Sequence, residues 1–182
     1  MECSTFDNDI KLGTVEGKVH AIASLLQKKD ENGDVSVEYL YCNWAQANVS
    51  LDKVDKPTII YVLPPSGDLD FTWNQVKDAP NAQIAFVCPT DFDFDGEENE
   101  GVIERMKRLC IRFIKNLNES GMFEQIEGKV MYRVLYDHLD QNVTGIIIEP
   151  QLKETEGIWI CADPGIRKKF MRIEEMEGND DE

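Results

Sequence analysis

The sequence predicts an α+β domain with a mixed or antiparallel sheet, a long helix across one face and a second helix near the N-terminus. Three observations support this class. Residues 97–118 carry a continuous apolar stripe at helical spacing, residues 13–29 carry a shorter one, and several short runs rich in β-branched and aromatic residues surround them. Two strong helical patterns joined to these runs by mostly short connections favour an α+β arrangement.

The helix predicted over 97–118 is the strongest element. Its apolar stripe faces the expected core and basic side chains occupy the other face. Glu104 and Arg108 have the spacing of a favourable ion pair, and Gly121 is placed to end the helix. The stripe is Val102, Ile103, Met106, Leu109, Cys110, Phe113, Ile114 and Leu117, and the basic face is Arg105, Lys107, Arg108, Arg112 and Lys115.

The N-terminal helix and the strands follow from shorter patterns. In residues 13–29, apolar side chains recur at helical spacing, and Pro150 indicates an edge strand or a bend in the last long strand. Residues 73–80 are predicted to form a polar loop. The helix stripe is Val15, Val19, Ile22, Ala23 and Leu26, and the expected strands are 35–44, 58–63, 82–88, 130–136, 145–152 and 158–161.

Length and charge limit the classes of function. The chain has 182 residues, 42% of them hydrophobic, which predicts one domain over residues 1–161 and a C-terminal extension over 162–182 with an acidic, disordered end. The absence of a signal peptide and of any apolar run near ~20 residues predicts residence in cytosol and no membrane partner. The net charge of −16 argues against adhesive binding of DNA or RNA.

Cysteine and histidine are too dispersed to indicate a metal centre. The five cysteines include no closely spaced pair, and their odd number argues against a closed disulfide framework. Only His20 and His138 are available as imidazole ligands. The sequence therefore predicts free thiols, several of them buried, and no cofactor.

The segment 90–100, just before the long helix, admits three interpretations: a calcium loop, a metal-dependent catalytic site, and an acidic junction between a strand and the helix. Asp91, Asp93 and Asp95 match the first, third and fifth positions of a calcium loop, but the twelfth position is Val102, which has no ligand atom. In the junction interpretation Asp95 caps the helix with Glu98 as its capping-box partner, and the nearby glutamates are stabilised by the positive end of the helix dipole. This junction is the favoured interpretation, and the three aspartates remain weak cation-site candidates.

No catalytic constellation emerges. His138 lies between Asp137 and Asp140, which suits a general base, yet no nucleophile is partnered with it, so a polar cluster at a strand end is the better explanation. Ser66 is not in a nucleophile elbow, and no phosphate-binding glycine motif is present. A metal-dependent hydrolase using Asp91, Asp93 and Glu98 is the least favoured possibility. The protein is expected not to be an enzyme.

Four blocks of the chain resemble small tail-region proteins of phages and prophages of gut Bacteroidota, over roughly residues 13–161. The blocks are Thr-Ile-Ile-Tyr-Val-Leu-Pro-Pro-Ser-Gly at 58–67, Ala-Gln-Ile-Ala-Phe-Val-Cys-Pro-Thr-Asp-Phe-Asp-Phe-Asp-Gly-Glu-Glu-Asn-Glu at 82–100, Glu-Arg-Met-Lys-Arg-Leu-Cys-Ile-Arg-Phe-Ile at 104–114 and Tyr-Asp-His-Leu-Asp-Gln-Asn-Val-Thr-Gly-Ile at 136–146. The element order is also similar to that of tail-terminator or tail-completion proteins of the neck.

The resemblance implies a non-enzymatic structural subunit of the virion, made in the bacterial cytoplasm and located in the tail or neck. It implies a homo-oligomeric ring, a hexamer by family analogy, that contacts other tail or neck proteins and lets DNA pass without specific binding. In such a ring, Asp91, Asp93 and Asp95 are candidates to meet Arg105, Arg108 and Arg112 of the next subunit. The alternative function is a cytosolic acidic binding module with an opportunistic divalent-cation site at residues 91–100.

Overall fold

The computed structural model describes residues 14–28, 36–64, 66–72, 75–91, 95–138 and 142–159. The predicted extension over 162–182 lies outside these residues. The elements, in chain order, are α2 (Val15–Ser24), β1 (Glu38–Cys42), α3 (Trp44–Leu51), β2 (Thr58–Val62), β3 (Gly67–Thr72), β4 (Gln75–Pro80), β5 (Gln83–Pro89), α4 (Gly96–Ser120), β6 (Tyr132–His138), β7 (Val143–Ile148) and β8 (Ile158–Trp159).

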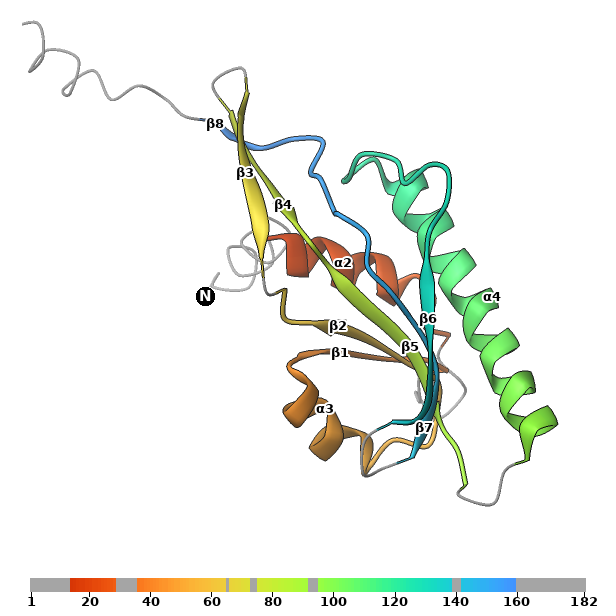
Figure 1. Cartoon of the computed structure of the whole chain (residues 1–182). Coiled ribbons are helices and arrows are strands. Elements are labelled where there is room, and N and C mark those ends of the chain that lie inside the picture. Colours follow the sequence, from red (N-terminus) through yellow and green to blue (C-terminus); the bar gives the residue numbers. More distant parts are fainter. Residues whose placement is uncertain are drawn as a thin grey trace, which may run out of the picture.

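The main sheet has five strands in the order β1-β2-β5-β7-β6. β1 and β2 are parallel and are joined through α3, whereas every other neighbouring pair is antiparallel. A second sheet, in the order β3-β4-β8, extends from the first where β4 leads into β5 (Figure 1). The prediction of an α+β fold with a mixed sheet, a long helix on one face and an N-terminal helix is confirmed.

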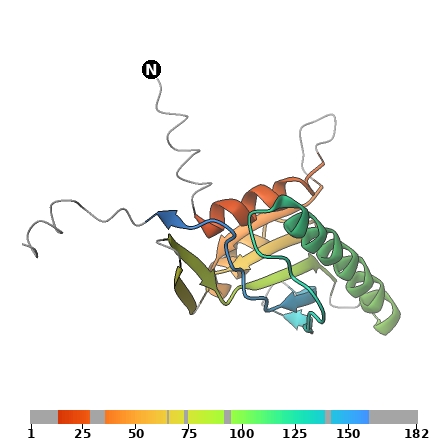
Figure 2. The same cartoon turned by 90° about the horizontal axis from the view of Figure 1, so that it is seen from above.

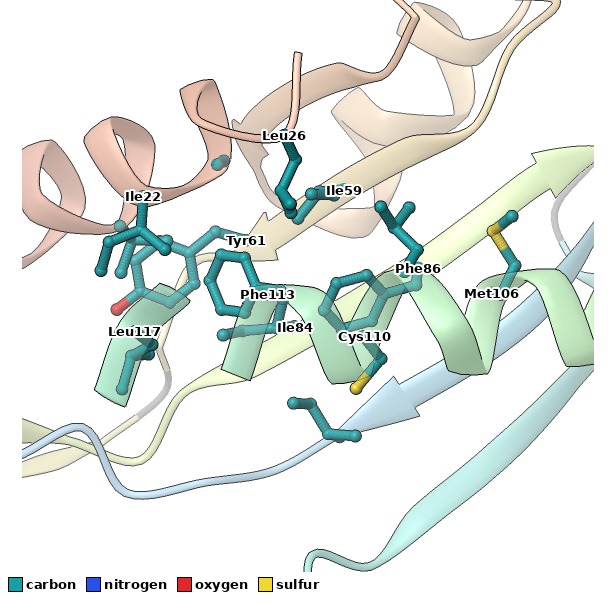
Figure 3. Packing of buried hydrophobic residues seen from close by; sticks show 14 of the residues in the cluster. Ile22, Leu26, Ile59, Tyr61, Ile84, Phe86, Met106, Cys110, Phe113 and Leu117 are labelled. Carbon is teal, nitrogen blue, oxygen red and sulfur yellow. The ribbon is translucent and has the colours of Figure 1, made fainter. Parts of the chain in front are cut away.

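The larger core lies between the main sheet and the helices α2 and α4. Alternate strand residues such as Ile59, Ile84 and Phe86 point to this side and meet the apolar stripes of both helices (Figure 3). The rings of Phe86 and Phe113 pack edge to face at 5.6 Å between centroids. Both predicted stripes are confirmed, since every member is buried except Ile114, which is half-buried.

The opposite face of the sheet has a smaller core that the sequence did not predict. Here α3 buries Ala47 and Leu51 against the other set of alternating strand residues, among them Ile60 and Val87. The helix has only these two buried positions, too few for a periodic pattern. Its local signal was the capping box, in which Asn43 and Gln46 satisfy each other's backbone donors at 2.9 and 3.3 Å.

The predicted loop over 73–80 was wrong, and of the two alternatives drawn from Pro150, an edge strand or a bend, the edge strand was wrong. The predicted loop over 73–80 contains β4, which forms an antiparallel hairpin with β3. Its Gln75, Lys77 and Asp78 are polar because the hairpin extends beyond the main core. The strand predicted over 145–152 is not at an edge, because β7 lies between β5 and β6. Pro150 follows the end of β7, where its carbonyl accepts a hydrogen bond from the Ala82 amide at 2.9 Å.

The hairpin and β8 lie at one end of the molecule, near the start of α2, in both views (Figures 1 and 2). The end of α2 lies at the opposite end, where it approaches α4. Among the helices of the described residues, none is long and apolar enough to cross a membrane.

Candidate interaction surface on helix α4

The first turn of α4 has the capping arrangement that the sequence predicts. The Asp95 Oδ1 atom accepts hydrogen bonds from the amides of Glu97 and Glu98, both at 2.9 Å, and the Glu98 side chain accepts one from the Asp95 amide at 3.0 Å. Gly121, with φ 67°, ends the helix in the left-handed conformation. Both predicted helix boundaries are therefore confirmed to within a residue or two.

A polar cluster behind this turn holds α4 on the sheet. Asn142, at the start of β7, donates to the Thr90 carbonyl at 3.1 Å, and the Thr144 hydroxyl donates to the Asn99 side chain at 3.0 Å. Asn142 has φ 44°, and its Oδ1 atom has no hydrogen-bond partner although it is buried. Local sequence patterns do not reveal this cluster, because it joins residues 90–99 to residues 142–144 and only the turn preference of Asn142 is visible locally.

The geometry at residues 91–102 differs from a calcium loop. Val102 belongs to the core and is only 2% exposed, and the preceding element is the strand β5 instead of an entering helix. Asp95 already uses one carboxylate oxygen for the cap, Asp91 is exposed, and Asp93 lies outside the described residues. Within the described segments, no group of three acidic, histidine or cysteine side chains is placed to hold a metal ion.

The arginine row on α4, Arg105, Arg108 and Arg112, borders a groove of about 420 Å³. All three residues are exposed, as is Lys28 after α2, which lines the same groove. Its apolar walls are the buried Leu26, Val37, Met106 and Leu109. Hereafter we call this feature the arginine groove. Three guanidinium groups with fixed positive charge lie along one side of it.

The three arginines form no ion pair with any of the described residues. The predicted pair between Glu104 and Arg108 is wrong, because the Glu104 carboxylate binds Lys107 at 2.6 Å instead. That hydrogen bond, together with one to Tyr132, raises the pKa of Lys107. The lysine also lies over the Tyr132 ring at 5.0 Å, which draws it toward β6 and away from the arginine row.

A second groove shows the contrasting arrangement. It measures about 610 Å³ and lies between the segment after α4 and the end of β7. Four of its charged groups are paired within the chain, since Arg133 binds Glu149 and Lys153 binds Glu124 at 3.2 Å. The other two, Glu127 and Lys129, are exposed and opposite in charge, so this groove lacks the cluster of unpaired cations that borders the arginine groove.

The remaining candidates from the sequence either pack within the fold or lie outside the described residues. Asp140 and the side chains of Asp137 and His138 are not described, so the polar cluster predicted around His138 lies outside the described residues. His20 stacks on Tyr39 with 4.7 Å between ring centroids. The thiols of Cys42, Cys88 and Cys110 are free and buried, and burial raises the pKa of Cys110 to about 12.

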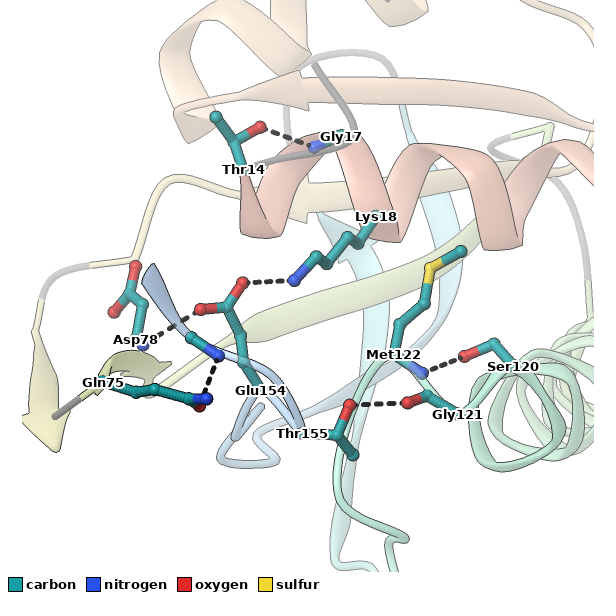
Figure 4. Close-up of polar contacts among 11 residues, drawn as sticks. Thr14, Gly17, Lys18, Gln75, Asp78, Ser120, Gly121, Met122, Glu154 and Thr155 are labelled. Carbon is teal, nitrogen blue, oxygen red and sulfur yellow. Dashed lines mark hydrogen bonds and ion pairs between the residues drawn. The ribbon is translucent and has the colours of Figure 1, made fainter. Parts of the chain in front are cut away.

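A partly buried ion pair, which no local sequence pattern indicates, joins α2 to the hairpin. The Lys18 ammonium contacts the Glu154 carboxylate at 2.6 Å, and the second carboxylate oxygen accepts a hydrogen bond from the Asp78 amide at 3.1 Å (Figure 4). Partial burial and then the Glu154 charge raise the pKa of Asp78. Because both oxygens of the Glu154 carboxylate have a partner, this cluster has the structural role of holding α2 against the hairpin.

Exposed apolar residues mark two further surfaces. On the edge strand β6, Tyr132, Val134 and Tyr136 share one face and are 47%, 39% and 55% exposed. On the edge strand β3, Leu69 and Phe71 are more than 60% exposed. Neighbouring apolar side chains on free sheet edges are typical of association surfaces.

Comparison with protein-family models, curated proteins and solved structures found no match to this chain.

Proposed function

We propose that this protein is a non-enzymatic structural subunit of a phage tail or neck, of the tail-terminator or tail-completion type. It assembles into a ring of identical copies that contacts other tail or neck proteins. The proposal joins the resemblance of blocks 58–67, 82–100, 104–114 and 136–146 to one observation about α4. That observation is the unpaired arginine row, located about two turns from a cluster of exposed carboxylates on the same helix.

These two surfaces favour head-to-tail assembly. The acidic surface comprises Asp91, Asp95 and the glutamates of the first helical turns, and it does not overlap with the arginine row. A contact between unlike patches leaves one free patch of each kind on the pair, so addition continues until a ring closes. In a ring of strongly acidic subunits, electrostatic repulsion lets DNA pass through the centre without being held.

The test of this function is the mass of the assembly. Light scattering and negative-stain images of the purified protein are expected to show a closed ring at low salt. The variant Arg105→Glu, Arg108→Glu, Arg112→Glu is expected to be monomeric, because it places acidic groups against an acidic neighbour. Its control is Lys53→Glu, Lys115→Glu, Lys129→Glu, which makes the same change of charge away from the groove and should still form rings.

Wild-type protein that remains monomeric at high concentration and low salt would contradict the proposal. Rings that survive the arginine changes would exclude the arginine row from the interface.

The acidic side of the interface has a separate test. Changing Asp91, Asp93 and Asp95 together to Asn removes three charges and preserves the cap, since Asn is as good an N-cap as Asp. Weaker ring formation is expected in light scattering. If the rings are unchanged at low and at high salt, these aspartates are not the partners of the arginine row.

A further inference from the structure

We propose that the arginine groove binds the acidic C-terminal segment, residues 170–182, of a neighbouring copy of this chain. The inference rests on the proposed assembly of identical subunits and specifies one of the contacts that join them. It concerns a groove between α2, the start of β1 and α4, whereas the aspartate contact described above involves the exposed side of the arginine row.

The groove has the two properties required by a partner that is both acidic and apolar. Its walls are buried aliphatic and thioether side chains, among them Leu26 just after α2 and Met106 on α4, which also belong to the main core (Figure 3). Its rim carries Arg105, Arg108, Arg112 and Lys28, which have no carboxylate partner among the described residues. In a chain with net charge −16, such a cluster of uncompensated cations favours an anionic ligand.

The C-terminal segment has the matching chemistry. The last nine residues contain six carboxylates and no basic group, and Ile173 and Met176 lie next to the first of these acids. Apolar residues that enter the groove would therefore place carboxylates beside the arginine rim. The Asp91–Asp95 region lacks aliphatic side chains of this kind.

The position of the segment favours a groove on another copy. The described residues end at Trp159 in β8, beside the hairpin and near the start of α2 (Figures 1 and 2). The groove is lined by Leu26 and Lys28, which follow the other end of α2. A domain of this size is about 40 Å across. The ten residues before Phe170 span at most ~35 Å when extended, which suits a neighbouring molecule better than a path around the same one.

A peptide of residues 166–182 tests the contact directly. Fluorescence anisotropy should show the labelled peptide binding to a full-length acceptor whose own segment is neutralised by Glu174→Gln, Glu175→Gln, Glu177→Gln, Asp180→Asn, Asp181→Asn and Glu182→Gln. Adding Arg105→Glu, Arg108→Glu and Arg112→Glu to the acceptor should weaken binding by roughly tenfold or more, because several ion pairs are lost together. The Lys53, Lys115 and Lys129 changes, and a scrambled peptide with intact acceptor, are the controls.

Mixing two full-length variants distinguishes a neighbouring copy from the same copy. One variant keeps the segment and carries the three arginine changes, and the other keeps the groove and carries the neutralised segment. If the segment binds in trans, the mixture gains hetero-pairs in light scattering that are lost when the segment of the first variant is neutralised as well. No new pair in the mixture, or no binding of the peptide, overturns the proposal.

Other outcomes are also decisive. If neutralising Asp30, Glu31 and Asp34 is required before the peptide binds, residues 29–35 of the same chain are the occupant and the proposal is wrong. Peptide binding and pair formation without any wild-type ring would support the contact and contradict the proposed function. Rings that persist with a neutralised segment, together with no peptide binding, would support the function and contradict the contact.

Discussion

At the scale of single residues, Asp95 has a clear structural role within the acidic segment 90–100: it caps helix α4. Its carboxylate satisfies two amides that the first turn of α4 would otherwise leave without an intrahelical partner. The same atom cannot serve fully as a metal ligand while it accepts these bonds. The segment is therefore a helix start, and its carboxylates at Asp91, Glu97 and Glu100 are exposed and available for contacts.

Asp95→Ala is expected to lower the free energy of unfolding by about 1–2 kcal/mol, because it removes both hydrogen bonds of the N-cap. Urea unfolding followed by circular dichroism measures the change. Asp95→Asn is the control, and its unfolding midpoint should stay close to that of the wild type. Equal losses from the two changes would mean that charge, and not capping, is responsible.

Asp78 gives a pH-dependent prediction. Its carboxyl pKa is raised above the ordinary 3.8 by desolvation and by Glu154, so the folded state holds this proton more tightly than the unfolded state. The stabilising contribution is complete below pH 3.8 and is lost as pH rises through the raised pKa. Asp78→Asn should therefore stabilise the fold at neutral pH, with the gain disappearing in acid.

Unfolding midpoints of Asp78→Asn and wild type across this pH range test the sign. Asp91→Asn, at an exposed site, controls for the loss of one negative charge. A gain that grows as the pH falls would refute the assignment.

At the scale of elements, α4 combines three roles on different parts of its surface. Its apolar stripe fills the main core, its first turn is fixed to the sheet by the Asn142 and Thr144 cluster, and its arginine row borders a groove. Because the helix is anchored at its N-terminus and along its length, the arginines are held on a rigid element.

The pairing of β5 with β7 depends on one glycine. A Cβ atom at Gly145 would lie 2.0 Å from the Phe86 carbonyl oxygen and 2.9 Å from the Val87 Cα atom, so the two strands would have to separate. Gly145→Ala should lower the free energy of unfolding by ~3 kcal/mol or more, at the upper end for an overpacked core. Differential scanning calorimetry measures this loss.

Gly101→Ala is the matched control for that experiment. No atom lies within 4 Å of a Cβ at Gly101, and the residue is inside α4, where alanine is favoured over glycine by about 0.5–1 kcal/mol. This change should raise the unfolding temperature. A similar loss at both positions would indicate that the close approach of β5 to β7 is not the cause.

At the scale of the whole molecule, the separation of charge predicts how assembly responds to salt. Exposed pairs between the arginine row and acidic partners are screened as the Debye length falls below ~10 Å. Raising NaCl from about 0.05 M to about 0.5 M should therefore move the protein from rings to smaller species in sedimentation velocity experiments. Rings stabilised by salt would instead point to the apolar edges at β3 and β6.

Much of the architecture could be predicted because it follows from local periodicity. The stripes of α2 and α4, the cap at Asp95 and the left-handed stop at Gly121 each depend on residues within a few turns. The hairpin was not predicted because its strands pair with each other beyond the main core. Their polar residues therefore show no strand pattern. Helix α3 was missed because two buried residues are too few to show a period.

The sequence alone determined the α+β class, the boundaries and faces of the long helix, and the acidic character of the chain, since these depend on residue type and spacing. Only the tertiary structure decided that Arg108 is unpaired, that Glu154 joins Lys18 to the hairpin, and that α2, β1 and α4 form a basic groove. The physical reason is that most of these contacts join residues far apart in the chain. Sequence spacing allows several possible partners for each residue, and only the packed structure determines which partner it contacts.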